Sequence, residues 1–453
     1  MRVLAAALGT LGAVGCATGA PRVGPADIPA LEEAVSSRPQ DAEARVGLGV
    51  ALYRADRYVD AVRVLDGAVE RGIRTGAAYL HLGLSYEALE LWAQARAAYG
   101  MYLEVGRSDP LKDELRHRMD LMARRELRAR AREAVAGERD AGAAPPTPRS
   151  LAVFPFGFHS DREDLEPLVY ALADMMTTDF GLSGAVTVLE RARLQSLLDE
   201  MSLTEAGYAD PRSGARAGRM MRAEHVVQGL ITDLGVEHLR LDSDVRSVPA
   251  ETSVGTLTAE DELANLFDME KDLVVRTLRD VLRVELTPQE EQAIRENRTD
   301  DLMAFLAYGR GLREMDRGDF AAAGASFGAA LELDPGYQAA QLAAAEAISL
   351  LSASSTGVDD IVEMAEESGE GDDLGERALD RFGAMDGEGR PRGALRGALL
   401  RSGNDVVNPT PGAAVVGPGP DTRNPVLEAF GLDDITRVGT GTIRILILNP
   451  VGD

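Results

Sequence analysis

The chain has 453 residues, 45% of them hydrophobic, and its 48 basic and 74 acidic residues give a formal net charge of −26. This length predicts about three domains, and the hydrophobic fraction is enough to build their cores. Proteins that bind nucleic acid gain affinity from lysine and arginine on phosphates, so this acidic chain is not expected to be one. No segment beyond the N-terminus is apolar for long enough to span a bilayer.

The chain begins MRVLAAALGTLGAVGC, and Cys16 is its one cysteine. Arg2 is followed by a run of small and apolar residues, whose length suits the core of a signal peptide and not a spanning helix. An ordinary secretory signal with a chance cysteine is one interpretation. A lone thiol would be a liability in an oxidising compartment, which favours a dedicated role for Cys16.

The tetrapeptide AVGC resembles the lipobox of bacterial lipoproteins, in which the cysteine is acylated and the signal is cut before it. The resemblance implies a signal peptide at residues 1–15, lipidation at Cys16 and an anchor linker at 16–27. An aspartate after the cysteine is associated with retention at the inner membrane. Ala17 stands there instead, so we expect a periplasmic protein anchored in the outer membrane by its lipid.

Residues 28–110 carry an internal repeat, because Leu48-Gly49 recurs 34 residues later as Leu82-Gly83. Small residues let paired helices approach closely, and larger ones fill the gaps between neighbouring pairs. The period and spacing resemble the tetratricopeptide repeat (TPR). We expect the concave repeat surface to bind other envelope proteins, with Tyr79 and Tyr86 as candidate partner-binding residues.

One more unit of the same kind is predicted at residues 300–350. Gly311, Ala323 and Phe327 fall on the same relative positions as in the N-terminal repeat. A single helical hairpin cannot bury its own apolar face. It must therefore pack on residues after Ala340, on the preceding domain or on another chain.

Between the repeat regions, residues 111–138 have helical spacing and contain seven arginines between positions 116 and 132. Contact with anionic lipid or an acidic partner is one hypothesis. We favour a solvated helix face that pairs with local glutamates and with the acidic surface of the protein itself. Residues 139–149 are rich in proline and small residues, which indicates a linker and a domain boundary.

Residues 150–285 read as an α/β domain with a βαβ-type order and right-handed crossovers. An alternating pattern and a long helix then close it. The predicted elements are strands at 151–156, 185–189 and 225–231, helices at 164–180 and 194–201, a hairpin of strands 236–246 and 252–259, and a helix at 261–284.

Four stretches of this domain, AVFPF, ALADMMTTDF, VTVLERARLQSLLDE and AEHVVQGLI, resemble the curli-production (CsgG-type) lipoprotein family. The resemblance implies an envelope protein in surface assembly or export, with an α/β periplasmic domain. Channel-forming members insert long amphipathic β-hairpins into the membrane, with strands of about 9–11 residues. The strand pair at 236–246 and 252–259 is short and charged, so we do not expect this chain to form a pore.

The sequence shows no motif for catalysis, metal or cofactor binding. Its five histidines form no close metal pair, and there is no phosphate-binding glycine loop or nucleophile elbow. The dipeptide His159-Ser160 gives only a weak reason to consider a hydrolase. We therefore predict no cofactor and no enzymatic activity.

A few polar residues of the middle domain invite a catalytic interpretation. Glu190, Arg191 and Glu200 have the types of an acid–base group. The interpretation we favour is that Arg191 and Glu200 bracket a helix and tie strand ends together. Tyr208 and Asp210 are likewise expected to be turn and packing residues.

Residues 351–437 are predicted to form an acidic segment of low order, with eight acidic and no basic residues between positions 359 and 373. Calcium binding there lacks the spacing of an EF-hand. The last stretch, TIRILILNP, is too apolar to stay exposed. We expect residues 438–453 to form a C-terminal strand that joins a sheet in this chain or in a partner.

The sequence therefore predicts an α+β multidomain protein: helical TPR repeats, a central CsgG-like α/β domain, a further TPR hairpin, and an acidic tail with a terminal strand. The function it favours is a protein-binding adaptor in cell-envelope or surface assembly and export. A ring-forming subunit of a secretion assembly is the alternative, which leaves homo-oligomerisation open. A hydrolase with an unrecognised site is a third hypothesis, and the missing catalytic motifs weigh against it.

Overall fold

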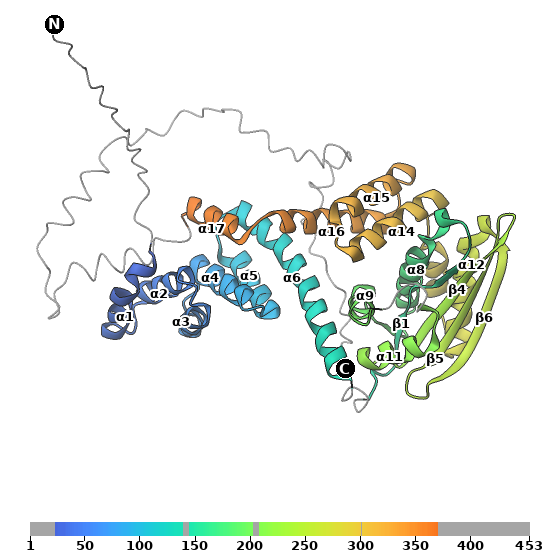
Figure 1. Ribbon diagram of the computed structural model, residues 1–453, viewed down its shortest axis with the longest axis horizontal. Helices are drawn as coiled ribbons and strands as arrows, with labels where there is room; N and C mark the ends of the chain where they lie inside the picture. The colour runs from blue at the N-terminus through green and yellow to red at the C-terminus, as the bar shows by residue number, and fades with distance from the viewer. Residues whose placement is uncertain (1–22, 139–144, 203–207, 300, 370–453) are drawn as a thin grey trace, which may run out of the picture. The chain divides into compact units, whose positions relative to one another are not determined.

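The computed structural model describes residues 23–138, 145–202, 208–299 and 301–369, which divide into two compact units (Figure 1). Unit 1 contains the described residues up to Met119 and those from Thr356 onward, and unit 2 contains those from Asp120 to Ser355. Cys16 with the predicted signal peptide and the predicted C-terminal strand lie outside the described residues. Within them, no helix is both long and apolar enough to cross a membrane.

Unit 1 is built from helices joined by short turns, as the repeat at residues 28–110 predicts. After a short 3-10 turn at Pro25–Asp27, its helices are α1 (Ile28–Ser37), α2 (Ala42–Arg54), α3 (Tyr58–Glu70), α4 (Gly76–Ala88), α5 (Trp92–Val105), the first part of α6 (Asp109–Ala136) and α17 (Val358–Glu367).

The hairpins α2/α3 and α4/α5 each contain the same kind of internal contact, between a glycine of the first helix and a large side chain of the second. A Cβ on Gly49 would lie 2.4 Å from Leu65 Cδ2, and a Cβ on Gly83 would lie 2.4 Å from Tyr99 Cε1. Both larger side chains are fully buried. The missing glycine side chain is therefore the space that the facing helix fills, and this explains the small residues of the 34-residue period.

The expectation of low order over residues 351–437 is wrong at its start. Helix α16 continues to Ser355, and Val358–Glu367 forms α17. The carboxylate of Asp360 accepts a hydrogen bond from the Gly357 backbone N–H at 2.6 Å, so an acidic residue caps the helix N-terminus. The prediction of a solvated, low-order chain is therefore wrong for the part of the acidic run that starts α17.

Packing within unit 1 holds α17 in place. Ile361 and Ala365, one turn apart on the helix, are buried. Glu366 forms an ion pair with Arg54 of α2 at 2.8 Å. The apolar stripe and this ion pair outweigh the acidic composition. The predicted tail beyond residue 369 lies outside the described residues.

Unit 2 contains a six-stranded mixed sheet in the order β3-β1-β4-β5-β6, with β2 paired to β4. Strands β1, β2 and β3 run parallel to their partners, and β4, β5 and β6 form an antiparallel meander. The strands are β1 (Ser150–Val153), β2 (Gly157–His159), β3 (Thr187–Val188), β4 (His225–Gly235), β5 (His238–Ser247) and β6 (Thr252–Glu262).

The βαβ order and the charged hairpin are confirmed, with two corrections. Strand β5 has 10 residues, one fewer than predicted, and β6 has 11, three more than predicted. Both lengths are within the range of about 9–11 residues of membrane hairpins, so shortness is wrong as a reason against a pore, and the charge of the strands remains. Strand β6 runs to Glu262, so the closing helix starts later than residue 261. The reason is pairing: β5 is bonded along its length to β4 on one side and to β6 on the other.

Helices complete unit 2, and α8 and α12 lie beside the sheet in Figure 1. They are the second part of α6, α8 (Leu168–Leu182), α9 (Arg191–Glu200), α11 (Pro211–Met221), α12 (Leu266–Arg276) with a π turn at Thr277–Val281, α13 (Pro288–Glu296), α14 (Leu302–Arg317), α15 (Phe320–Leu333) and α16 (Gln338–Ser355); 3-10 turns occupy Glu163–Leu165 and Leu263–Asn265.

Helices α14 and α15 form the hairpin predicted at 300–350. A Cβ on Gly311 would lie 2.4 Å from Phe327 Cε1, the same contact as in unit 1. The hairpin packs on α16, and α14 also packs on α8 of the α/β domain, where a Cβ on Gly309 would lie 2.2 Å from Pro167 O. Its apolar face is thus covered both by the residues that follow it and by the preceding domain.

Candidate functional site

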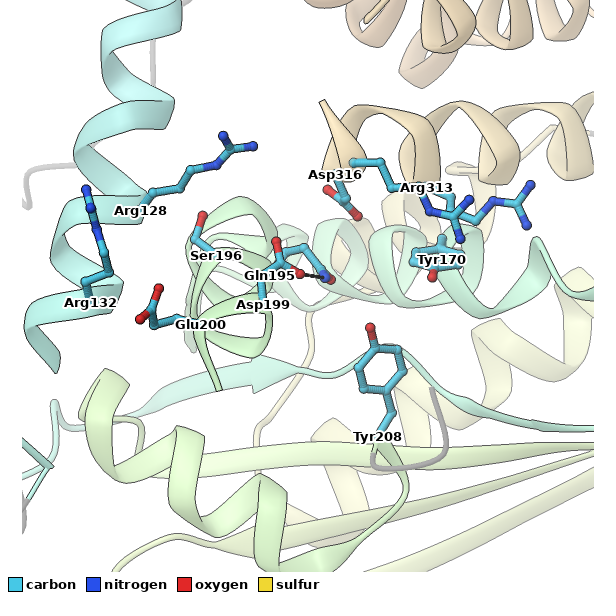
Figure 2. Close-up of a pocket in the computed structure, with 11 residues that line it drawn as sticks. Arg128, Arg132, Tyr170, Gln195, Ser196, Asp199, Glu200, Tyr208, Arg313 and Asp316 are labelled. Carbon is cyan, nitrogen blue, oxygen red and sulfur yellow. Dashed lines mark hydrogen bonds between the residues drawn. The ribbon is translucent and has the colours of Figure 1, made fainter. Parts of the chain in front are cut away.

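A pocket of ≈ 860 Å³ opens in unit 2 where the second part of α6 meets α9 and α14 (Figure 2). Its volume is within the range of about 300–1,000 Å³ that is usual for ligand pockets. The side chains that line it are Arg128, Arg132, Tyr170, Gln195, Ser196, Asp199, Glu200, Tyr208, Arg313, Asp316 and Arg317.

Two tyrosines supply the aromatic part of the lining. Tyr170 of α8 is 6% exposed and Tyr208 is 4% exposed. The Gln228 side chain of β4 donates a hydrogen bond to the Tyr208 carbonyl at 2.6 Å, and Asp210 caps α11. Figure 2 shows the Tyr208 ring pointing into the pocket. The prediction that Tyr208 and Asp210 are packing and turn residues is confirmed, and Tyr208 also lines this pocket.

Helix α9 forms one wall, because Gln195, Ser196, Asp199 and Glu200 share a face at i, i+1, i+4 and i+5. The Gln195 amide donates a hydrogen bond to Asp199 at 2.8 Å, which fixes both side chains. The other amide atom, Gln195 Oε1, is buried with no partner among the described residues. A buried acceptor without a donor is costly, so this atom points to a missing donor.

Three exposed arginines stand around the pocket with no hydrogen-bond or ion-pair partner among the described residues: Arg128 and Arg132 of α6, and Arg317 at the end of α14. By contrast Arg124, one turn earlier on α6, pairs with Glu346 at 2.9 Å. Gly318 ends α14 at a φ of +80°, and a Cβ there would lie 3.8 Å from Arg128 Nη2. The end of α14 therefore comes close to Arg128.

The other charged groups of the lining are held by neighbours. Arg313 pairs with Glu166, although its buried Nε has no partner among the described residues. Asp316 accepts two hydrogen bonds from Arg191, at 2.7 and 3.0 Å. The free positive charge at the pocket thus comes from the three exposed arginines.

Arg191 is the centre of a largely buried network. Besides Asp316 it contacts Asp174 of α8 at 3.3 Å, and Tyr308 of α14 donates to Asp174 at 2.7 Å. Burial opposes its charge, but Asp316 and Asp174 outweigh that effect and raise the pKa of Arg191. Burial raises the pKa of Tyr308 well above its ordinary value. As predicted, Arg191 and Glu200 bracket a helix, but Arg191 ties helices α8, α9 and α14 together, not strand ends.

A second ionic cluster lies wholly inside unit 2. Lys271 contacts Glu270 at 3.0 Å and also pairs with Asp179, and Asn297 donates to Asp179 at 2.6 Å. The two carboxyls and the ammonium are at most 1% exposed. Burial and the nearby Asp179 raise the pKa of Glu270. With no access for a substrate, this cluster serves packing and pH-dependent stability.

The residues predicted for partner binding lie in unit 1. Tyr79 is 3% exposed, so its side chain belongs to the interior of the repeat and offers no surface to a partner. Tyr86 is half-buried, and its hydroxyl donates to Asp66 at 2.6 Å. Partner binding at Tyr86 stays a proposal. Ser160 of the His159-Ser160 dipeptide donates its hydroxyl proton to Asp233 at 2.7 Å and not to His159.

Sequence reasoning missed the pocket as a site. It noticed the arginines of residues 116–132, and the predicted local pairing is confirmed for Arg116 with Asp113 and Arg130 with Glu126. It did not foresee that Arg118 is buried. The spacing of Arg128 and Arg132 was the available signal, but nothing in the sequence joined them to Arg317. Among the described residues, no group of three His, Cys, Asp or Glu side chains is placed to hold a metal.

Comparison with known protein families finds a match to part of the α/β domain. Residues 153–240 match the family model described as curli production assembly/transport component CsgG. The matched segment runs from the end of β1 to the start of β5, and so includes α8, α9, α11 and β4. No curated protein matches the sequence. The family match covers the α9 wall of the pocket but neither α6 nor α14.

Proposed function

We propose that this chain is an outer-membrane-anchored periplasmic lipoprotein that acts as a protein-binding adaptor in cell-envelope or surface assembly and export. The observation that carries the proposal is the match of residues 153–240 to a family of curli assembly and transport components. A domain from such a family, in a chain that begins with a lipobox-like AVGC, favours an anchored envelope protein over an enzyme.

The helical hairpins support the adaptor role. Three of them repeat the contact of a glycine with a large side chain 16 positions later, in α2/α3, α4/α5 and α14/α15. This regularity is typical of TPR-like units, which present surfaces for protein binding. We propose that these hairpins, with Tyr86 on the surface of the first set, bind other envelope proteins.

Anchoring is tested by expressing the full chain and its Cys16→Ser variant in a Gram-negative host. We expect the wild type to lose residues 1–15, gain the mass of acyl chains and fractionate with the outer membrane. The variant should stay unacylated. Two or more acyl chains are needed for stable anchoring, so their number is read from the intact mass. A wild-type protein that is soluble and unacylated would overturn the anchored part of the proposal.

The mass in detergent separates the adaptor from a ring-forming export subunit. An adaptor should run as a monomer or dimer by light scattering, whereas a ring gives one discrete, much higher mass. Crosslinking in cells then tests the partner claim, with the Cys16→Ser variant as the control for membrane placement. A discrete ring would replace the adaptor proposal by the alternative.

A further inference from the structure

The pocket of unit 2 is positively charged within a strongly acidic protein. The chain carries −26, yet Arg128, Arg132 and Arg317 stand at this pocket without partners among the described residues. Of the three acidic groups in the lining, Asp316 is paired with Arg191, whereas Asp199, bonded only to the neutral Gln195 amide, and Glu200 keep their charge against the three arginines. Free guanidinium groups therefore outnumber free carboxylates, and the pocket suits an anionic ligand.

The positions of the arginines favour several anionic groups on one ligand. Arg128 and Arg132 lie one turn apart on α6, whereas Arg317 comes from the end of α14. A guanidinium presents a planar fork of N–H donors that matches a carboxylate with two hydrogen bonds. A ligand with carboxylates spaced along its length can pair with the arginines of α6 and with Arg317 of α14 at the same time.

The inner surface of the pocket carries hydrogen-bonding groups in place of free charges. Among the described residues, the buried Oε1 of Gln195 has no donor and the buried Nε of Arg313 has no acceptor. A peptide backbone offers N–H donors and carbonyl acceptors together, whereas a fully ionised carboxylate or phosphate can only accept hydrogen bonds. Tyr170 and Tyr208 line the same pocket, and at 6% and 4% exposure they shape its wall more than they offer contact area.

We propose that this pocket binds a short acidic peptide segment of a partner protein, with its Asp or Glu side chains on the three arginines and its backbone against Gln195 and Arg313. The inference rests on the proposed adaptor function and gives it a partner chemistry. The site is independent of lipidation, so binding in the test tube and membrane anchoring fail or succeed separately.

The test uses the full chain purified in detergent and a fluorescein-labelled hexaglutamate peptide, followed by fluorescence anisotropy. The variant combines Arg128→Gln, Arg132→Gln and Arg317→Gln. The matched control combines Arg57→Gln, Arg63→Gln and Arg130→Gln, which changes the charge equally at exposed arginines outside the pocket. Circular dichroism checks that both variants are folded.

We expect at least tenfold weaker binding for the pocket variant, less than threefold for the control, and weaker binding at higher salt. Gln195→Met should weaken peptide binding several-fold. Equal losses in the two triple variants, or no binding by the wild type, would overturn the proposal. Tripolyphosphate is tested as a competitor of the peptide. If it displaces the peptide, and if Gln195→Met changes the affinity of neither ligand, the pocket is a general anion site and the peptide proposal is wrong.

Discussion

The hairpins α4/α5 and α14/α15 have the same interior and different attachments. Each packs a large side chain into the space left by a glycine: Tyr99 against Gly83, and Phe327 against Gly311. The interior is thus a property of a stretch of about thirty residues. The attachment of each hairpin depends on elements elsewhere in the chain.

Both attachments combine a tyrosine and an arginine with carboxylates, one carboxylate in unit 1 and two in unit 2. In unit 1, Tyr99 and Glu87 belong to the hairpin, and only Arg118 comes from α6; Arg118 binds Glu87 through two hydrogen bonds, at 2.8 and 2.6 Å. In unit 2, only Tyr308 and Asp316 belong to the hairpin; Asp174 comes from α8 and Arg191 from α9. The same repeat unit can therefore extend an array or dock on an α/β domain.

The largest effect should come from removing the arginine of each network. Arg191→Met leaves two carboxylates, the partly buried Asp174 and Asp316, without their cation, and we expect it to lower the free energy of unfolding of unit 2 by about 3–5 kcal/mol. Arg118→Met leaves only one carboxylate, Glu87, without its cation, so its loss of unfolding free energy should be smaller. Arg130→Met, at an exposed pair, is the control, with about 0–1 kcal/mol expected.

Urea unfolding can follow the two units separately, because Trp92 of α5 is the one tryptophan of the chain. Its fluorescence reports on unit 1, whereas far-ultraviolet circular dichroism reports on both units. Arg191→Met should shift the dichroism curve more than the fluorescence curve, and Arg118→Met should move the fluorescence curve. If both variants shifted both curves equally, the assignment of Arg191 to the stability of unit 2 and of Arg118 to that of unit 1 would be wrong.

The second prediction is an opposite pH dependence of the two units. Burial lowers the pKa of His81 in α4 to about 4, and its Nε2 has no partner among the described residues. The folded state thus binds fewer protons than the unfolded state, and unit 1 should lose stability as the pH falls from 6.5 towards 4. At about 1.4 kcal/mol per pKa unit, the loss is a few kcal/mol.

In unit 2, burial and Asp179 raise the pKa of Glu270, so there the folded state binds more protons than the unfolded state. Unit 2 should lose stability as the pH rises from the ordinary Glu value near 4.5 through the raised pKa. Urea curves at several pH values test both signs. Glu270→Gln should flatten the dependence of unit 2, and His81→Gln that of unit 1; a dependence unchanged in either variant contradicts the assignment.

The smallest effect concerns the interior that the hairpins share. Gly83→Ala and Gly311→Ala place a Cβ against a packed ring, and we expect each to destabilise its unit by about 1–2 kcal/mol. Gly100→Ala in α5 and Gly324→Ala in α15 meet nothing within 4 Å, so helix propensity should stabilise by about 0.5–1 kcal/mol. Thermal unfolding measures all four; the same sign at both kinds of position would refute the shared contact.

Local patterns in the sequence determined much of this architecture. The 34-residue spacing that relates Gly49 to Gly83 predicted the helical hairpins, because close helix contact needs small residues at fixed positions. The alternation around Leu239 and Leu241 predicted a strand with one buried face, and both side chains are 1% exposed. These features depend on residues close together in the chain, where periodicity carries the information.

Tertiary structure alone decided the rest. Whether an acidic run starts a helix, as at α17, depends on what its apolar face packs against. The candidate pocket joins Arg128 and Arg132 of α6, Gln195 of α9 and Arg317 of α14, which are far apart in sequence. No periodicity links such positions. They become neighbours only because α14 packs on α8, which places the C-terminal end of α14 close to Arg128.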